Sequence, residues 1–333
     1  MIRRHMIMGA AAVGLAVASC SGSNNNSPTP TPTPTGTPTP TPSASPTYDA
    51  FPLSKALEFS TISAATSYTG DDTAGAVTLG AANTDAGSSR VRLATDPAIT
   101  TGTYVVRENV EESRFTNTNI LTAPTPAVEE FAFRTTDTAT AGKFSQVNFL
   151  NNAIPSQVTS NTALQLTSVS YFNWWRGDST TGAKRITTGL WGFPTVFSDL
   201  PTSTSQAYSS VIRGRMVSVA NGATTIVPVT GTATVQVNFA TGVVTLSASL
   251  STAPASGTGT AIGTFAAQGA IPVGATQYIG SFNAGSPLSG TIVGSFFGSA
   301  GKEVGMTFAL SGNNNGADQR IVGVVVGKKA TAL

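Results

Sequence analysis

The chain has 333 residues, one cysteine, one histidine and a formal net charge of +2. Cys20 and His5 both lie near the N-terminus, so the rest of the chain lacks the usual zinc and copper ligands, Ser-His and Cys-His nucleophilic pairs and redox dithiols. It also lacks a G-x-S-x-G motif, a phosphate loop and a Rossmann glycine pattern. The composition therefore predicts a protein that is not an enzyme and holds no metal and no cofactor.

Residues 1–19 are typical of a bacterial lipoprotein signal peptide. Two arginines precede an apolar run, residues 6–17, that is too short to span a bilayer as a helix. Residues 17–20 (VASC) look like a lipobox, although an ordinary cleaved signal with an incidental cysteine is the alternative. We expect Cys20 to carry diacylglyceryl and N-acyl (palmitate) chains that anchor the protein to a membrane. By resemblance to enterobacterial sorting, Ser21 favours the outer membrane.

Residues 20–47 are predicted to form a disordered tether. After the cysteine they read SGSNNNSPTPTPTPTGTPTPTPSASPT, with no apolar residue large enough to build a core. Alternating Pro and Thr favours extended polyproline II, which rises about 3 Å per residue. We therefore expect the tether to hold the folded part away from the membrane.

The two halves of the remaining chain differ in charge. Residues 48–163 carry 12 acids and 7 bases, whereas residues 164–333 carry 4 acids and 9 bases. Such an asymmetry can steer a partner or hold two halves together. The basic residues are too dilute for a nucleic-acid surface, so we expect no nucleic-acid partner.

Three pairs of adjacent acids are the remaining candidates for carboxylate chemistry: Asp71-Asp72, Glu111-Glu112 and Glu129-Glu130. All three lie in polar, turn-rich stretches, which is typical of solvated loops and strand ends. A calcium site at Asp71-Asp72 is an alternative that no loop pattern supports.

Residues 48–195 predict a β domain with irregular strands. Thr, Ser, Val and Gly dominate, and no long stretch keeps apolar residues at helical spacing. We expect this smaller sheet domain to pack on, or precede, the domain that follows. Short strands are predicted at 104–106, 130–133 and 147–149, and two longer ones near 165–176 and 186–193.

Residues 196–333 predict an eight-stranded antiparallel barrel. Val235, Val237 and Phe239 alternate with polar residues, and Thr241-Gly242 then turns the chain into a second alternating strand. An up-and-down barrel fits such consecutive hairpins because it leaves no open edge. The eight strands are predicted near 205–219, 231–240, 242–250, 260–268, 276–284, 288–298, 303–311 and 319–327. The side chains predicted to point inward are Tyr208, Ile212, Met216, Ile292, Phe296, Met306, Phe308 and Leu310.

A membrane-spanning barrel is the alternative, because eight strands of this length are permitted in a bilayer. The outward faces, however, carry Thr, Ser, Gln, Asn and two arginines, Arg213 and Arg215, where lipid would require an apolar band. The chain also ends in KKATAL, without a terminal aromatic residue. We therefore expect a soluble barrel.

Several motifs in this region resemble the lobes of transferrin-binding protein B. Residues 198–202 (SDLPT), 207–209 (AYS) and Gly214 are similar to the family's "lPtsGtatYsG…G" pattern at the start of the barrel. Residues 235–239 (VQVNF) are similar to its "l.VNF" strand. The strongest match is 294–308 (GSFFGSAGKEVGMTF), which resembles the family's "G.FyGp.a.EvgG.F" hallmark.

The match has departures. Thr204 replaces an expected glycine, Phe297 replaces tyrosine, Ser299 replaces proline and Met306 replaces the second glycine of the hallmark. The resemblance covers roughly residues 165–312. It implies one lobe, made of an N-terminal handle sheet and an eight-stranded barrel. Transferrin receptors of the family carry two such lobes, and their ligand contacts lie in variable loops that match no position here.

The resemblance also implies an outer-membrane lipoprotein, displayed at the cell surface, that captures a protein or iron-source ligand. A TonB-type outer-membrane receptor is the implied partner. Display on the periplasmic face is the alternative for location. A structural or interaction lipoprotein of the envelope, with no small ligand, is the alternative for function.

The tryptophans offer the best indication of a binding surface, since aromatic and arginine side chains anchor many interfaces. Residues 170–176 and 190–195 resemble strands before the barrel in distant bacterial relatives, and they contain all three tryptophans of the chain. The alternative is that these residues pack the handle against the barrel. Adjacent tryptophans in a strand point to opposite faces, so one of them is expected to be exposed. The candidate binding residues are Trp174, Trp175, Arg176 and Trp191.

Overall fold

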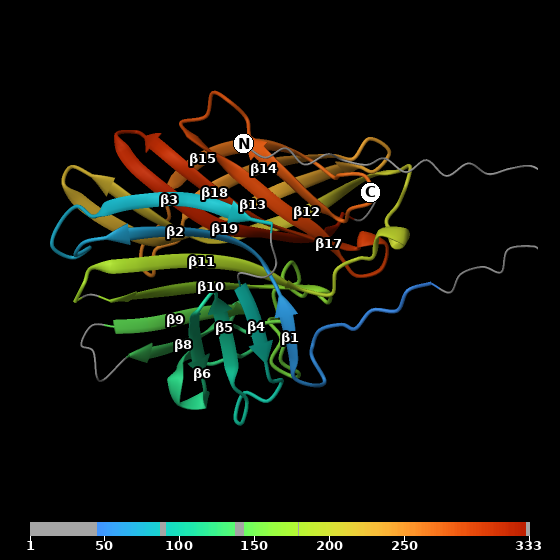
Figure 1. The fold of residues 1–333 in the computed structure, drawn as a ribbon, viewed down its shortest axis with the longest axis horizontal. Coiled ribbons are helices and arrows are strands. Elements are labelled where there is room, and N and C mark those ends of the chain that lie inside the picture. Colours follow the sequence, from blue (N-terminus) through green and yellow to red (C-terminus); the bar gives the residue numbers. More distant parts are fainter. Residues whose placement is uncertain (1–44, 87–90, 137–142, 179, 331–333) are drawn as a thin grey trace, which may run out of the picture. The chain divides into compact units, whose positions relative to one another are not determined.

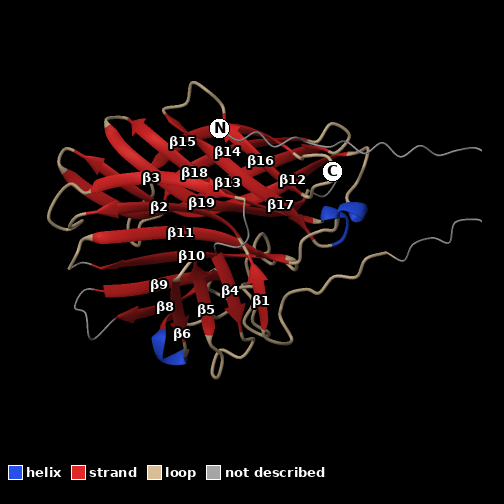
Figure 2. Cartoon of the chain, in the orientation of Figure 1, coloured by secondary structure: helices blue, strands red, loops and turns tan. Residues whose placement is uncertain are grey.

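The computed structural model describes residues 45–86, 91–136, 143–178 and 180–330. Cys20, the signal peptide and most of the predicted tether lie outside the described residues. The described chain is all-β, as predicted (Figure 2), and its helical segments are short 3-10 turns. No helix of the described chain is long and apolar enough to cross a membrane. The turns are η1 (Asn117–Asn119), η2 (Phe197–Asp199) and η3 (Ser299–Gly301).

The C-terminal strands form a closed antiparallel barrel (Figure 1), which confirms the eight-stranded prediction. Each strand pairs with the next, and the last pairs with the first. The strands are β12 (Ser205–Ala220), β13 (Ala223–Asn238), β14 (Val243–Thr252), β15 (Ala261–Ala270), β16 (Gln277–Phe282), β17 (Leu288–Phe297), β18 (Glu303–Asn314) and β19 (Ala317–Lys329).

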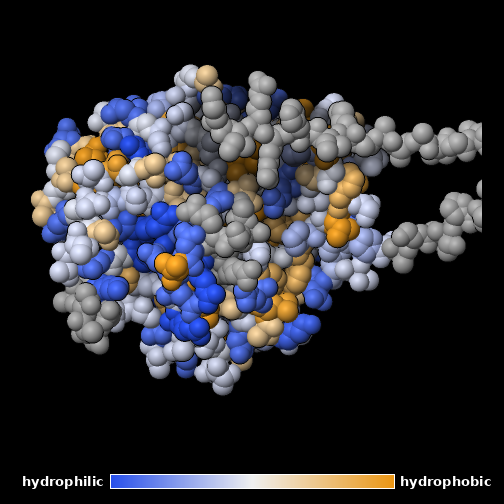
Figure 3. All heavy atoms as spheres, in the orientation of Figure 1, coloured by the Kyte–Doolittle hydropathy of each residue, from blue (hydrophilic) through white to orange (hydrophobic). Residues whose placement is uncertain are grey.

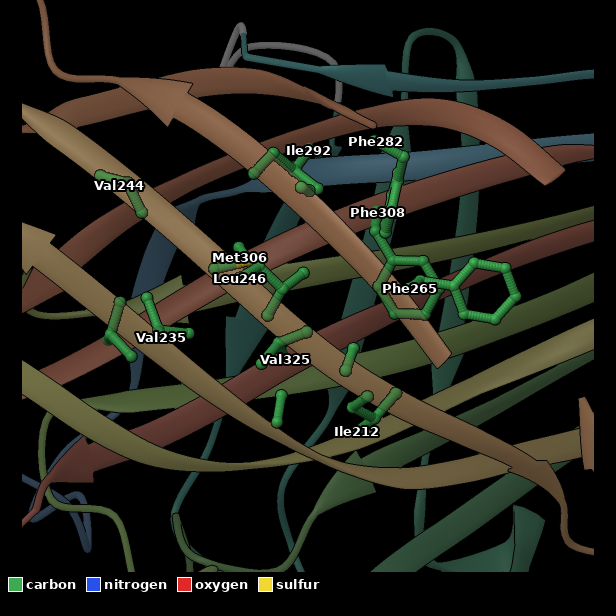
Figure 4. Close-up of a cluster of buried hydrophobic side chains, with 14 of the residues drawn as sticks. Ile212, Val235, Val244, Leu246, Phe265, Phe282, Ile292, Met306, Phe308 and Val325 are labelled. Atoms are coloured by element: carbon green, nitrogen blue, oxygen red, sulfur yellow. The ribbon is translucent and has the colours of Figure 1, made fainter. Parts of the chain in front are cut away.

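The barrel interior is filled with apolar side chains from all eight strands (Figure 4). Every residue predicted to point inward belongs to this cluster. Phe282 stacks edge-on against Phe265 at 6.3 Å and against Phe308 at 6.4 Å between ring centroids. The alternation of buried and exposed residues in β14 and β15 leaves Thr, Ser and Gln on the outer face. The barrel interior is thus a packed core.

Strand β13 begins eight residues before its predicted start at 231. A tight turn at Asn221 and Gly222, both with positive φ, lets β12 reverse directly into β13. Pro228 lies within this extension and cannot donate a ladder hydrogen bond. In the structure β14 pairs with β13 only from Val229 onward, and Pro228 takes part through its carbonyl, which accepts from the backbone N of Ala253 at 2.8 Å.

The N-terminal strands form a handle of two sheets. The larger sheet has the order β3-β2-β11-β10-β9-β8-β7, and the smaller has the order β1-β4-β5-β6. Phenylalanines dominate the core between them, with Tyr104 and Trp174 among the largest buried side chains. The strands are β1 (Leu57–Ser60), β2 (Ile62–Thr69), β3 (Thr78–Asp85), β4 (Val91–Thr95), β5 (Tyr104–Glu108), β6 (Glu111–Phe115), β7 (Ile120–Thr122), β8 (Glu130–Thr136), β9 (Lys143–Leu150), β10 (Val169–Asp178) and β11 (Ala183–Gly192).

The other face of the larger sheet packs on the barrel. Strand β19 contains the unbroken apolar run 321–326 (IVGVVV), the pattern of a strand that is buried on both faces. Ile321 and Val325 point into the barrel, whereas Val322, Val324 and Val326 contact the handle. The handle therefore covers one side of the barrel wall.

Candidate functional site

The handle carries a cleft of about 520 Å³. We call it the handle cleft. The two strands β10 and β11 form its floor, and the start of β6 and of β9 form its walls. Two of the four predicted binding residues, Trp174 and Arg176, line it. Its charged residues have both signs: Glu111, Glu112, Lys143, Arg176, Asp178, Lys184 and Arg185.

A buried carboxylate organises one wall of the handle cleft. Glu108, at the end of β5, is 3% exposed and accepts hydrogen bonds from two arginines. Arg176 Nη2 lies 2.5 Å from Glu108 Oε2, and Arg185 Nη2 lies 2.5 Å from Glu108 Oε1. Thr187 donates a further hydrogen bond of 3.1 Å from Oγ1 to Glu108 Oε2. The carboxylate is therefore held by charge-assisted bonds on both of its oxygens.

These bonds shift the pKa of Glu108. Burial is the largest single influence and raises the pKa, but the hydrogen bonds and charges of Arg185 and Arg176 together outweigh it and lower the pKa to about 2. Glu108 thus stays ionised at neutral pH. Its charge fixes the two arginines at the floor of the handle cleft.

Arg176 links the buried network to the opening of the cleft. Its guanidinium lies 3.6 Å from the ring centroid of Trp174, a cation–π contact. Its Nε also donates a hydrogen bond of 2.6 Å to Glu111, whose side chain is 60% exposed. Trp174 itself is buried and donates from Nε1 to Ser145 Oγ at 2.7 Å. Glu111 and the exposed Lys143 are therefore the groups of the cleft that a partner would meet first.

Trp175 points to the opposite face of β10, as the alternation of strand side chains predicts. It is half-buried and lines a second hollow of about 390 Å³, which we call the Trp175 groove. Its Nε1 donates to Tyr68 Oη at 3.0 Å, and the Arg215 guanidinium lies 4.9 Å from its ring centroid. Phe144 and Lys184 line both this groove and the handle cleft, so the two hollows adjoin around the ends of β9, β10 and β11.

Trp191 is placed apart from the other candidates. It is buried in the core between the two handle sheets, where its ring centroid lies 5.1 Å from that of Phe51 and 4.8 Å from that of Phe59. The alternative, that the tryptophans pack the handle against the barrel, describes only Trp175, through its contact with Arg215 of β12. A ligand-binding role for these residues stays a prediction.

The hallmark motif has a structural role that the sequence did not reveal. Glu303, its glutamate, is 4% exposed at the start of β18 and accepts four hydrogen bonds from the handle. Its Oε1 accepts from the backbone N and Oγ1 of Thr167, and its Oε2 accepts from the backbone N of Ser168 and of Val169, all at 2.8–3.0 Å. We call this contact the Glu303 joint. It fastens the segment that leads into β10 to the barrel.

Two glycines of the same motif permit the close approach. A Cβ on Gly305 would lie 3.1 Å from side-chain atoms of Leu190 and Val169 in the handle. Gly298 has φ +70, and its N–H donates to the carbonyl of Phe193 at 2.9 Å. The resemblance therefore rests on residues that build the fold.

Charge also joins the two halves. Arg213 on β12 forms an ion pair with Glu129 of the handle. Lys328 Nζ donates to the carbonyl of Thr162 at 2.8 Å, and Arg320 Nε to that of Gly80 at 2.9 Å. These contacts fit the second role expected of the charge asymmetry, which is to hold the two halves together.

The sequence indicated solvated loops or strand ends for the three acidic pairs, but each pair contributes at least one residue to an ion pair. Glu129 contacts Arg213, Glu111 contacts Arg176, and Asp72 lies 3.2 Å from Lys184. In the described part of the chain, no group of three or more His, Cys, Asp or Glu could hold a metal ion. The Glu108 network has no signature in the sequence, because its members come from the two different handle sheets and meet only when those sheets pack together.

The fold and the hollows define a single lobe in which a two-sheet handle is fastened to a packed barrel. No family model matches the chain, and neither does any curated protein. Among solved structures, a point mutant of transferrin-binding protein B from Haemophilus parasuis is similar over 84% of this chain and 77% of its own, with 11% identity and a TM-score of 0.38.

Two further solved structures are similar. Isotype 1 transferrin-binding protein B from serogroup B Neisseria meningitidis shares 14% identity over 81% of this chain and 44% of its own, with a TM-score of 0.39. HpuA from Kingella denitrificans, solved with human haemoglobin, shares 15% identity over 86% of this chain and 92% of its own, with a TM-score of 0.39. These identities and scores are too low to transfer a ligand or a residue's role.

Proposed function

We propose that the chain is a non-enzymatic, lipid-anchored lipoprotein of the outer membrane that captures a protein ligand at the cell surface. The observation that carries this proposal is that the open hollows lie in the handle and not inside the barrel. Its barrel, which in other proteins of this architecture can enclose a small ligand, is filled by its own side chains. The handle instead opens the cleft and the Trp175 groove outward.

The two adjoining hollows suit a protein partner better than a small solute. They are open, they combine three aromatic residues (Phe144, Trp174 and Trp175) with charges of both signs, and several of those charges are already held in fixed positions. Preorganised aromatic and arginine side chains lose little conformational entropy on binding, and such residues dominate the energy of protein interfaces. The capture surface we propose is therefore the part of the handle around the two hollows, which we call the tip of the handle. Trp175 and Arg176 from the sequence prediction and Glu111 from the structure face a partner there, and the buried Trp174 supports Arg176 from below.

The sequence supports the proposed location. The lipobox at Cys20 and the long tether are the features of a lobe that is anchored to a membrane and can reach away from it. The motifs shared with transferrin-binding protein B support the capture of a host protein or other iron source. Under this proposal a TonB-type outer-membrane receptor accepts what the lobe captures.

Two experiments test the proposal. The mature chain carrying Cys20→Ser, which cannot be lipidated, is immobilised and used as bait against fluids and membranes from iron-replete and iron-starved cultures. We expect a saturable protein ligand, and retention of a TonB-type receptor from membranes of the iron-starved cells. Retention of envelope proteins alone would favour the structural lipoprotein instead.

Protease treatment of intact cells tests display. A surface-displayed lobe is cleaved in the tether and released while a periplasmic marker stays intact. A lobe that resists protease until the outer membrane is opened faces the periplasm, and capture at the cell surface is then excluded.

A further inference from the structure

Large apolar side chains gather at one end of the barrel. Phe197 in η2 is 56% exposed, Val273 in the β15–β16 connection is fully exposed, and Val196 is 44% exposed. Phe197 and Val273 line the same groove of about 340 Å³, whose floor includes Phe239 and Ile271. Figure 3 shows hydrophobic surface at the end of the lobe where η2 lies. We call this surface the apolar rim.

The described chain starts beside the same rim. Tyr48 Oη accepts a hydrogen bond of 3.1 Å from the backbone N of Val196 and donates one of 3.0 Å to Asp199 Oδ2. Asp199 Oδ2 in turn accepts from the backbone N of Ala300 in η3 at 2.8 Å. Residue 48 is thus fastened to η2 and η3, so the segment that connects to Cys20 leaves the lobe next to Phe197.

We propose that the apolar rim docks on the surface of the phospholipid bilayer that holds the lipid anchor. This rests on lipidation of Cys20, which belongs to the proposed function. The anchor confines the lobe to within the reach of 27 residues of tether, residues 21–47. Such confinement raises the effective lipid concentration so far that a weak apolar contact is enough to hold the lobe down. The tether then determines how far the lobe can leave the bilayer, and the rim determines how often it does.

The rim carries little net charge. The exposed Lys302 and the ammonium of Lys329 lie near η3, and Asp49 and Asp199 lie near Tyr48. Opposite charges of equal number favour an apolar contact over attraction to anionic lipid. We therefore expect docking that persists at high salt and does not require anionic lipid.

Docking leaves the capture surface free. No residue that lines the groove of the rim also lines the handle cleft or the Trp175 groove.

The test is sedimentation of the Cys20→Ser mature chain with phosphatidylethanolamine–phosphatidylglycerol vesicles, and with phosphatidylcholine vesicles, at low and high salt. We expect Phe197→Ser and Val273→Ser each to lower the partition coefficient about ten-fold, because each removes one inserted apolar side chain. Matched controls are Leu121→Ser and Val110→Ser, which change equally exposed apolar residues of the handle (55% and 97%) and should have no effect.

Three results would overturn the proposal. The wild-type chain could fail to sediment with either kind of vesicle even at lipid concentrations as high as the effective concentration that the tether sets. The rim and control variants could lose binding equally. Sedimentation velocity could show that the rim variants abolish a dimer or a complex with the captured protein while vesicle binding is unchanged. Because no lipid on Cys20 and no captured ligand enter the vesicle assay, failure of the proposed function would leave its result intact.

Discussion

The barrel closes on itself and fills its interior with aliphatic and aromatic side chains, whereas the handle packs two open sheets and leaves hollows at their edge. In the barrel the ladder continues from β19 back to β12, so no strand edge is free. In the handle the end of β10 and the starts of β9 and β11 border the two hollows, which three of the four candidate binding residues line. The comparison indicates that the barrel supplies rigidity and the handle supplies the surface for recognition.

The two regions also treat charge differently. The main barrel core is built around an apolar cluster that includes two tyrosines, and Tyr208 within it donates to the carbonyl of Gly301 at 2.7 Å. The handle buries Glu108 and pairs it with Arg176 and Arg185. A buried ion pair is sensitive to the removal of one partner, because the other charge then lacks compensation. Substitutions at charged residues can therefore test the Glu303 joint and the Glu108 network separately from the binding surface.

The largest effect is expected at the Glu303 joint. Glu303→Ala would leave the backbone N–H groups of Ser168 and Val169 buried without an acceptor and would remove both bonds to Thr167, at a cost of about 3–5 kcal/mol. We expect the urea midpoint to fall accordingly, with the handle exchanging amide hydrogens before the barrel does. The control is Asp318→Ala, which removes a half-exposed acid paired with Arg320 and should change stability by less than about 0.5 kcal/mol. Equal midpoints for the two variants would show that the joint contributes nothing.

Next in size is the network under the handle cleft. The folded pKa of Glu108, about 2, lies below its value in an unfolded chain, so its contribution is complete above the unfolded pKa of roughly 4.3 and is lost as pH falls through 2. The shift corresponds to about 3 kcal/mol. Glu108→Gln should therefore lose stability near neutral pH and show a flatter fall below pH 4.3 than the wild type. Parallel stability curves for the two proteins from pH 6 to pH 2 would rule out this role.

A smaller loss is expected where the handle approaches the barrel. Gly305→Ala places a Cβ at 3.1 Å from Leu190 and Val169, and we expect a cost of about 1–2 kcal/mol from the displaced neighbours. Gly75→Ala is the control, since a Cβ there would meet only a backbone oxygen at 3.6 Å. Thermal unfolding measures both variants, and a loss at Gly75 as large as that at Gly305 would contradict the steric reason.

The smallest effect on stability, but a direct effect on binding, is expected at the Trp175 groove. Trp175 is half-buried, so Trp175→Ala should cost about 1–2 kcal/mol and leave the fold intact. We expect capture of the ligand to weaken about ten-fold, with partial rescue in Trp175→Phe. Unchanged capture by the folded Ala variant would exclude Trp175 from the binding surface.

The sequence was most informative about the barrel, where each strand alternates and each hairpin is local. The inward residues Ile212 and Phe308 could be predicted because a period of two is read directly from the chain. The early start of β13 was not predicted, and only the register with β14 shows how the strand accommodates Pro228. Local sequence patterns thus predict most of the barrel.

The candidate site was less predictable. That Trp174 and Trp175 face opposite ways follows from strand geometry, but which of them is more accessible depends on the sheet that packs above β10. Glu108 and Arg185 are 77 positions apart, and Glu303 lies 136 positions from Thr167. Contacts between residues this far apart in sequence have no signal in one chain, so both the network and the joint required the structure.

The most direct test of the account is whether capture belongs to the tip of the handle. The double variant Glu111→Ala, Trp175→Ala changes one accessible residue in each adjoining hollow, and Asp318→Ala changes an acid of similar exposure on the barrel. The double variant, Asp318→Ala and the wild type are each immobilised as bait at equal loading, after circular dichroism has confirmed that each is folded. The account predicts that the double variant loses most of the captured protein while Asp318→Ala retains it. Full retention by the double variant would contradict it.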